Sequence, residues 1–222
     1  MNMLTVWPPA HNHLMKGGFF ERLFAKFSLA GEPSFVHLNI EKTANFSQKY
    51  PNVPAPESKL SIKLLAAEWA SHGIYGEDMP QVAANLLEAG YDSPSLRRLA
   101  GEMRVTCSAD VEDLVRRTFR ELGVPYPLSE KQAKLIVTRQ VARLVIAGEY
   151  DPERAGTFLE IQIWGWSHET EDLSRLFALN DELTWSPEHR RPVALVRDDL
   201  VDAFARLALC TDEQIFAPDS SS

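Results

Sequence analysis

Helix start and stop signals recur at short, regular intervals along the chain from Ser58 onward. A Ser, Thr or Asp precedes nearly every apolar stretch, and a Gly follows several of them. A side-chain oxygen at a helix start accepts a hydrogen bond from a free backbone N–H group, and glycine readily takes the left-handed conformation that ends many helices. The pattern therefore predicts a series of short helices joined by loops of roughly 3–8 residues.

The fifth predicted helix, between Ser129 and Gly148, carries the apolar residues Leu135, Ile136, Ala142, Val145 and Ile146. We therefore expect it to be the central and most buried helix. Connections as short as these do not allow long parallel crossovers, so the sequence predicts a mainly α fold, an irregular bundle of about eight short helices. The predicted starts are Ser58, Asp78, Ser93, Ser108, Ser129, Asp151, Thr170 and Pro192, and the stops include Gly73, Gly90, Gly101, Gly123 and Gly148.

Residues 1–57 differ in composition from the rest of the chain. They contain six prolines, and apolar residues at helical spacing predict only one helix, over 18–30. Apolar and polar residues alternate over 34–40, which is typical of a half-buried strand, and residues 4–7 are its candidate partner. The proline-rich run before Ser58 favours an extended connector. We therefore expect a small N-terminal α/β appendage over residues 1–57, a helical domain over 58–215 and a disordered tail over 216–222.

The composition is that of a globular protein with a packed core. Apolar residues make up 45% of the 222 residues and charged residues 24%, a balance unlike that of disordered chains. Cys107 and Cys210 fit no disulfide or zinc-ribbon spacing. Prolines and histidines interrupt the N-terminal apolar residues, and no segment approaches the roughly 20 apolar residues of a membrane span. We expect a cytoplasmic protein with no membrane association and no cofactor.

Negative charge is concentrated in the last third of the chain. The formal net charge is −8, but residues 149–222 alone hold 16 acidic and 6 basic residues. A field of this sign attracts basic partners and repels nucleic acid. Arginines in the middle third alternate with acidic residues, as on a solvated helix face. We therefore predict no binding to nucleic acid, and we keep two interpretations of the acidic third, a docking surface or a contribution to solubility.

One short pattern at a helix junction supports a resemblance. The run AGEYDPERAG comprises Ala147, Gly148, Glu149, Asp151, Pro152, Ala155 and Gly156. With the stretches DSPSLRRLAGE and FRELGVPYP before it, the chain resembles a widespread type of small, uncharacterised bacterial all-helical protein that shares an AGE-x-DP-x-x-A-G junction. The resemblance covers roughly residues 60–210. It implies a helical fold, and it implies no activity or cofactor.

The pattern His168-Glu169-x-x-Asp172 is similar to a helical zinc site with aspartate in the last ligand position. Such a site needs its ligands on one face of a single helix, whereas Thr170 is a predicted helix start inside the pattern. We therefore interpret the segment as a turn with acidic residues at a helix N-terminus. The pair His11 and His13 lacks a further ligand. No metal site is predicted.

Signatures of nucleophilic catalysis and of phosphate loops are missing, because the chain contains no G-x-S-x-G, G-x-x-x-x-G-K or G-x-G-x-x-G pattern. Cys107 precedes a predicted helix start, where a thiolate is stabilised, but it has no identifiable histidine partner. We therefore predict no catalytic residue.

The last predicted helix places Asp198, Asp199 and Asp202 opposite its apolar stripe. Asp198 and Asp202 are four residues apart, so their repulsion costs roughly 0.2–0.5 kcal/mol unless a cation lies nearby. That cation is either Arg206 of the same helix or a group on a basic partner. Tryptophans flank the acidic stretch. Tryptophan is enriched at interface hot spots, although core packing is the alternative role.

The leading hypothesis is a non-enzymatic protein-binding protein, resembling an immunity protein, antitoxin or adaptor, that docks an acidic, Trp-containing helical surface onto a basic protein partner. The alternative is an enzyme whose site is assembled from distant residues around His168 and Glu169, with Glu160 as a further member. The predicted partner-binding residues are Trp164, Trp166, Glu169, Glu171, Asp172, Trp185, Asp198, Asp199 and Asp202.

Overall fold

The computed structural model describes residues 46–165, 170–184 and 191–217. Every regular element in these ranges is helical, which confirms the mainly α class. The predicted helix over 18–30 and the two predicted strands lie outside the described residues, as does most of the predicted tail.

The helices follow one another closely along the chain, after a short helical stretch at residues 46–49. Two 3₁₀ turns, η1 (Gly76–Asp78) and η2 (Ser108–Asp110), precede α4 and α6, and a π-helix, η3 (Leu159–Trp164), continues α8. The α-helices are α3 (Ile62–Ala70), α4 (Met79–Glu88), α5 (Pro94–Ala100), α6 (Glu112–Glu121), α7 (Glu130–Ile146), α8 (Pro152–Phe158), α9 (Glu171–Thr184), α10 (Val193–Ala208) and α11 (Asp212–Ile215).

Four of the predicted helix starts are confirmed in atomic detail. The side chains of Ser93, Asp151 and Thr170 each accept a hydrogen bond from the backbone N–H three residues ahead. Ser129 and Gln132 form the reciprocal capping box that the sequence predicts for the fifth helix. Gly90, Gly123 and Gly148 have positive φ angles, so these predicted stops are confirmed as well.

Two other predicted starts, Asp78 and Pro192, directly precede α4 and α10, whereas the starts at Ser58 and Ser108 are corrected by a few residues. Helix α3 begins after Ser61 rather than Ser58, because the Ser61 side chain caps Leu64. At the end of α3, His72 takes the left-handed conformation expected of Gly73, with φ of 57°. At the start of α4 the side chain of Asp78 makes no capping bond.

Two further differences concern short elements. Ser108 starts the 3₁₀ turn η2, and the fourth predicted helix begins only at Glu112. Helix α11 is additional to the predicted helices, and its start is a capping box between Thr211 and Gln214.

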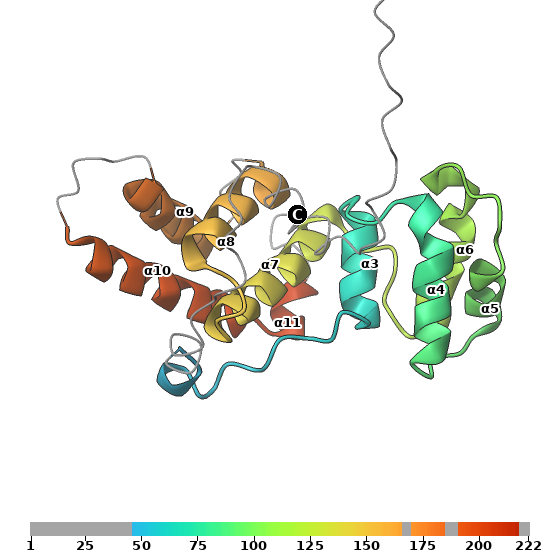
Figure 1. The fold of residues 1–222 in the computed structure, drawn as a ribbon, viewed down its shortest axis with the longest axis horizontal. Coiled ribbons are helices and arrows are strands. Elements are labelled where there is room, and N and C mark those ends of the chain that lie inside the picture. Colours follow the sequence, from blue (N-terminus) through green and yellow to red (C-terminus); the bar gives the residue numbers. More distant parts are fainter. Residues whose placement is uncertain (1–45, 166–169, 185–190, 218–222) are drawn as a thin grey trace, which may run out of the picture. The chain divides into compact units, whose positions relative to one another are not determined.

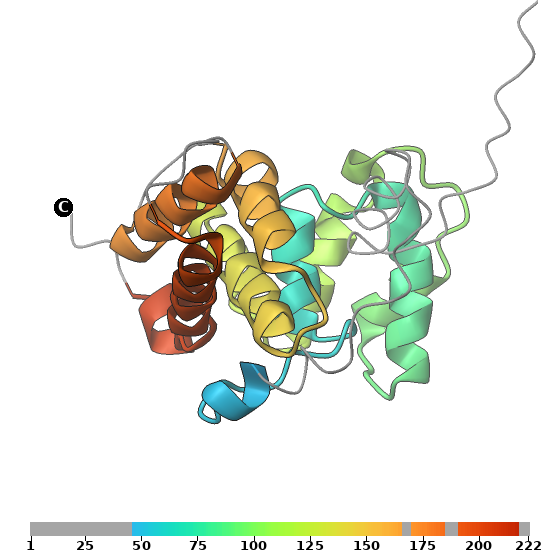
Figure 2. The same cartoon turned by 60° about the vertical axis from the view of Figure 1, so that its left-hand side comes forward.

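Helix α7 is the centre of the packing, as predicted. It contacts α3 on one side and α10 on another, and it also touches α8, η3 and α11 (Figures 1 and 2). It contributes ten buried residues, the largest number of any described helix, although α3 buries a larger share of its residues. Helices α4, α5 and α6 pack against one another in chain order. None of the described helices is long and apolar enough to cross a membrane.

The connection between α7 and α8, over residues 147–156, has a structural explanation at several positions. Gly148 has φ of 72°, and Glu149 donates a backbone hydrogen bond to Leu144 across the end of α7. Asp151 caps α8. A Cβ atom on Gly156 would lie 2.5 Å from the Asn180 side chain, so glycine allows α9 to approach α8 closely.

The burial of α7 gives a direct stability test. Ile146 is 3% exposed, whereas Leu135, also expected in the core, is only partly buried. We expect Ile146→Ala to lower the free energy of unfolding by about 2–5 kcal/mol, because a cavity forms where the side chain was. Leu135→Ala, measured by the same chemical denaturation, should cost clearly less. Equal losses at the two positions would mean that the faces of α7 are assigned wrongly.

A second prediction concerns alkaline pH. Burial raises the pKa of Tyr150 to about 12, above the ordinary value of about 10. The folded state thus favours the neutral phenol, so this contribution is complete below pH 10 and is lost as the pH rises toward 12. We expect Tyr150→Phe to remove about 2 kcal/mol of the pH dependence in this window. The exposed Tyr91→Phe is the control, and curves of equal slope for the two variants would contradict the assignment.

Candidate functional site

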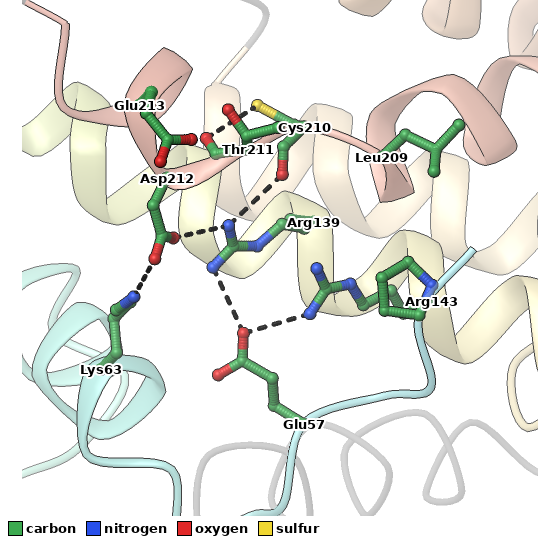
Figure 3. Close-up of a pocket in the computed structure, with 10 residues that line it drawn as sticks. Glu57, Lys63, Arg139, Arg143, Leu209, Cys210, Thr211, Asp212 and Glu213 are labelled. Carbon is green, nitrogen blue, oxygen red and sulfur yellow. Dashed lines mark hydrogen bonds and ion pairs between the residues drawn. The ribbon is translucent and has the colours of Figure 1, made fainter. Parts of the chain in front are cut away.

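A pocket of about 330 Å³ lies where α7 meets α3, the end of α10 and the residues just before α3 (Figure 3). Both acidic and basic side chains line it, together with a few apolar ones. The lining residues are Pro54, Glu57, Lys63, Arg139, Arg143, Leu209, Cys210, Thr211, Asp212 and Glu213. The described structure thus gathers in one place residues from four separate stretches of the chain.

Arg139 is the most buried charged group of the pocket, with its side chain 5% exposed. Its Nη1 donates to Asp212 Oδ1 at 2.8 Å and to the Cys210 carbonyl oxygen at 3.3 Å. Its Nη2 donates to Glu57 Oε1 at 3.2 Å. The remaining nitrogen, Nε, is buried without a hydrogen-bond partner.

Arg143 lies one helical turn further along α7 and shares the same carboxylate. Its Nη1 donates to Glu57 Oε1 at 3.2 Å, and its Nε donates to the Ala208 carbonyl oxygen at 3.3 Å. Burial lowers the pKa of Arg143, and the neighbouring positive charge of Arg139 acts in the same direction. Two guanidinium groups therefore share a single carboxylate oxygen.

The two arginines also stabilise the end of α10. The last carbonyl groups of a helix have no partner inside the helix, and they carry the negative end of its dipole. Arg139 and Arg143 supply donors and positive charge to the carbonyls of Cys210 and Ala208. This role explains why basic side chains occupy a face of α7 that is otherwise covered.

Two further groups that line the pocket, Asp212 and Cys210, have shifted pKa values. Burial raises the pKa of the Asp212 carboxyl, but hydrogen bonds from Lys63 and Arg139 outweigh it and lower the pKa overall. Burial raises the pKa of the Cys210 thiol, which disfavours the nucleophilic thiolate. The pocket is therefore lined by three cationic and three anionic side chains, and its donors belong to Lys63, Arg139 and Arg143.

Residues 46–57 attach the chain ahead of α3 to α7 and α10. The Ser47 hydroxyl lies 3.4 Å from the Ile146 carbonyl oxygen. Glu57 exchanges two hydrogen bonds with the Gln140 side chain, through its backbone N–H and its carbonyl oxygen. Lys49 and Tyr50 both donate to Asp202. The predicted boundary at residue 58 thus falls within a set of contacts.

The five described acidic residues that were predicted to bind a partner are exposed or half-buried, and three of them have partners within the chain. Asp199 pairs with Arg191, and Asp172 lies 3.8 Å from Arg206. Lys49 is 2.9 Å from Asp202, and the positive charge of Arg206 on the same helix also favours the ionised Asp202 carboxylate, so both cations come from within the chain. Burial raises the pKa of Asp202, but hydrogen bonds from Tyr50 and Lys49 outweigh it and lower the pKa overall. Glu171 and Asp198 are exposed.

Trp164 is a core residue, which corrects its prediction as a partner-binding residue. Its side chain is 1% exposed, and Nε1 donates to the Thr138 hydroxyl at 2.9 Å. Trp166, Glu169 and Trp185 lie outside the described residues, as does His168. Cys107 is exposed at the start of η2. Within the described ranges, no three His, Cys, Asp or Glu residues are arranged to hold a metal ion.

The pocket residues were missed by sequence reasoning, although one signal was present. Arg139 and Arg143 are four residues apart on the helix expected to be most buried, and a buried helix rarely carries two charges without partners. Their partner Glu57 lies 82 and 86 residues away and has no pattern of its own.

Comparisons with known protein families, with curated proteins and with solved structures give no match for this chain.

The attachment of residues 46–57 gives a third prediction. A chain of residues 58–217 should still unfold cooperatively, but we expect its free energy of unfolding to be about 2–5 kcal/mol below that of residues 46–217, because Arg139 and Arg143 lose their shared carboxylate. Lys49→Ala in the longer chain, which breaks only an exposed pair, should cost at most about 1 kcal/mol. Calorimetry measures all three.

Equal stabilities of the two fragments would show that the segment contributes nothing. Loss of the cooperative transition in the shorter fragment would show that residues 46–57 belong to the core and that a domain does not begin at residue 58.

Proposed function

We propose that the protein is a non-enzymatic binding protein that docks a more basic protein, as an immunity protein or an adaptor would. The docking surface is the acidic surface, defined as Glu171 and Asp172 of α9 with Asp198, Asp199 and Asp202 of α10. The observation that carries the proposal is a charge imbalance on two helices in contact. Helices α9 and α10 pack against each other and together carry seven carboxylates and three guanidinium groups.

The ion pairs within the chain determine how much each carboxylate of the acidic surface can contribute to attracting a basic partner. Asp199 and Asp202 are partly compensated by Arg191 and Lys49, so they act mainly through the summed field of the surface. Glu171 and Asp198 are exposed and available to basic side chains of the partner. Exposed charges of this kind speed diffusional encounter more than they prolong the complex.

The alternative function is an enzyme with a site around His168 and Glu169. These two residues lie outside the described part of the chain, while Glu160 is buried in η3. No observation on the described residues favours this alternative over binding, so the protein-binding proposal is the one we carry forward.

Association kinetics test the proposal. A partner is first captured from the native host with the full chain as bait and identified by mass spectrometry. Its binding is then measured by surface plasmon resonance at two ionic strengths. For the triple variant Asp198→Asn, Asp199→Asn, Asp202→Asn we expect a lower association rate and a nearly unchanged dissociation rate. Added salt should slow the wild type in the same way, because exposed charges are screened beyond about 8 Å at physiological ionic strength.

A second triple variant serves as the matched control. Glu77→Gln, Glu88→Gln and Glu102→Gln change the net charge by the same amount at exposed positions on η1, α4 and the α5–η2 connection. If the control variant slows association as much as the aspartate variant does, the association rate depends on the net charge of the protein alone. The acidic surface would then not be the docking site. An association rate indifferent to salt and to both variants would refute steering altogether.

A further inference from the structure

The guanidinium groups of the pocket have hydrogen-bonding capacity that the chain's own carboxylates leave unused. Arg139 Nε is buried without a partner. Arg143 uses Nε and Nη1, and its Nη2 forms no hydrogen bond with the described residues. A buried donor without an acceptor costs free energy, and the cost is greater when the group is charged. Both nitrogens belong to residues that line the pocket.

The geometry of Arg139 indicates what kind of group fits. The Nε and Nη2 groups of a guanidinium lie on one edge and match two oxygens of a single oxyanion. Glu57 gives only Oε1 to this edge, at 3.2 Å from Nη2, and the same oxygen also accepts from Arg143. The second oxygen of Glu57 accepts from the Ser61 hydroxyl at 2.6 Å. The edge is therefore half occupied.

We infer that this pocket binds a small molecule through an oxyanion, either a phosphate or a carboxylate group, with Arg139 and Arg143 as the binding residues. The incoming oxyanion takes the place of the Glu57 carboxylate, because two anions side by side would repel each other. This inference is independent of the protein-binding proposal, which concerns α9 and α10.

The rest of the pocket suits a ligand larger than the bare anion. A volume of about 330 Å³ lies at the lower end of the range for small-molecule sites. Lys63 adds a third cation beside Asp212. Leu209, which is 46% exposed, and Pro54 offer apolar contacts to the remainder of the ligand. The negative charge of Glu213 would repel a bound oxyanion. We therefore expect the oxyanion to lie toward Arg143, away from Glu213.

The test uses the full chain with inorganic phosphate and succinate as probes, titrated by calorimetry at constant ionic strength maintained with chloride. We expect saturable binding of at least one probe. Arg143→Gln should weaken it by about tenfold or more, because a charged donor is lost. Arg117→Gln, an exposed arginine on α6, is the matched control and should bind as the wild type does. Tighter binding of phosphate than of succinate would assign a phosphate-bearing ligand, and the reverse order a carboxylate-bearing one.

Glu57→Gln gives the opposite signature, because it removes the competing carboxylate. We expect this variant to bind the preferred probe about tenfold more tightly than the wild type. Its thermal unfolding midpoint should also rise more in phosphate or succinate than in chloride. Arg143→Gln provides the baseline for the general stabilising effect of these salts. Absence of saturable heat with both probes in the wild type and in Glu57→Gln, or unchanged affinity in Arg143→Gln, would overturn the inference.

Discussion

The guanidinium of Arg139, buried on the central helix, is the interaction on which the arrangement around the pocket depends. Its oxygen partners come from Glu57, Cys210 and Asp212, which lie between 71 and 82 residues away in the sequence. Breaking a buried ion pair by removing one partner costs several kcal/mol. The segment ahead of α3, the end of α10 and the turn into α11 are therefore all joined to α7 through this one side chain. Each of these contacts adds to the stability of the arrangement around the pocket.

The features predicted correctly are those whose physical cause is local. A helix start at Ser129 depends on Gln132 three residues on, and a stop at Gly148 depends on a single backbone angle. The errors arise where two local choices compete. Ser58 and Ser61 are both good N-cap residues, and Ser61 caps the helix while Ser58 lies in the preceding turn. Propensity cannot decide between them, since the outcome depends on packing further along the chain.

The pocket and the burial of Trp164 depend on distant contacts. Arg139 and Arg143 are visible in the sequence as two charges on an apolar helix, but nothing near Glu57 shows that it pairs with them. Trp164 belongs to an acidic, surface-like stretch in the sequence, yet the π-helix η3 continues α8 and brings its indole to Thr138 on α7. Lys49 likewise reaches Asp202 from 153 residues away. A tertiary contact at such separation leaves no periodic pattern.

The two cysteines differ in solvent exposure, so their chemical reactivity can be used as a probe of the structure. Cys107 is exposed, whereas Cys210 is half buried beside the pocket with a thiol whose pKa is raised. Alkylating reagents attack the thiolate, so the two sites react at different rates. Because Cys210 lines the pocket, a molecule bound there would shield its thiol from the reagent, while Cys107 would react as before. A single chemical label, introduced without any substitution, would therefore show whether the pocket is occupied.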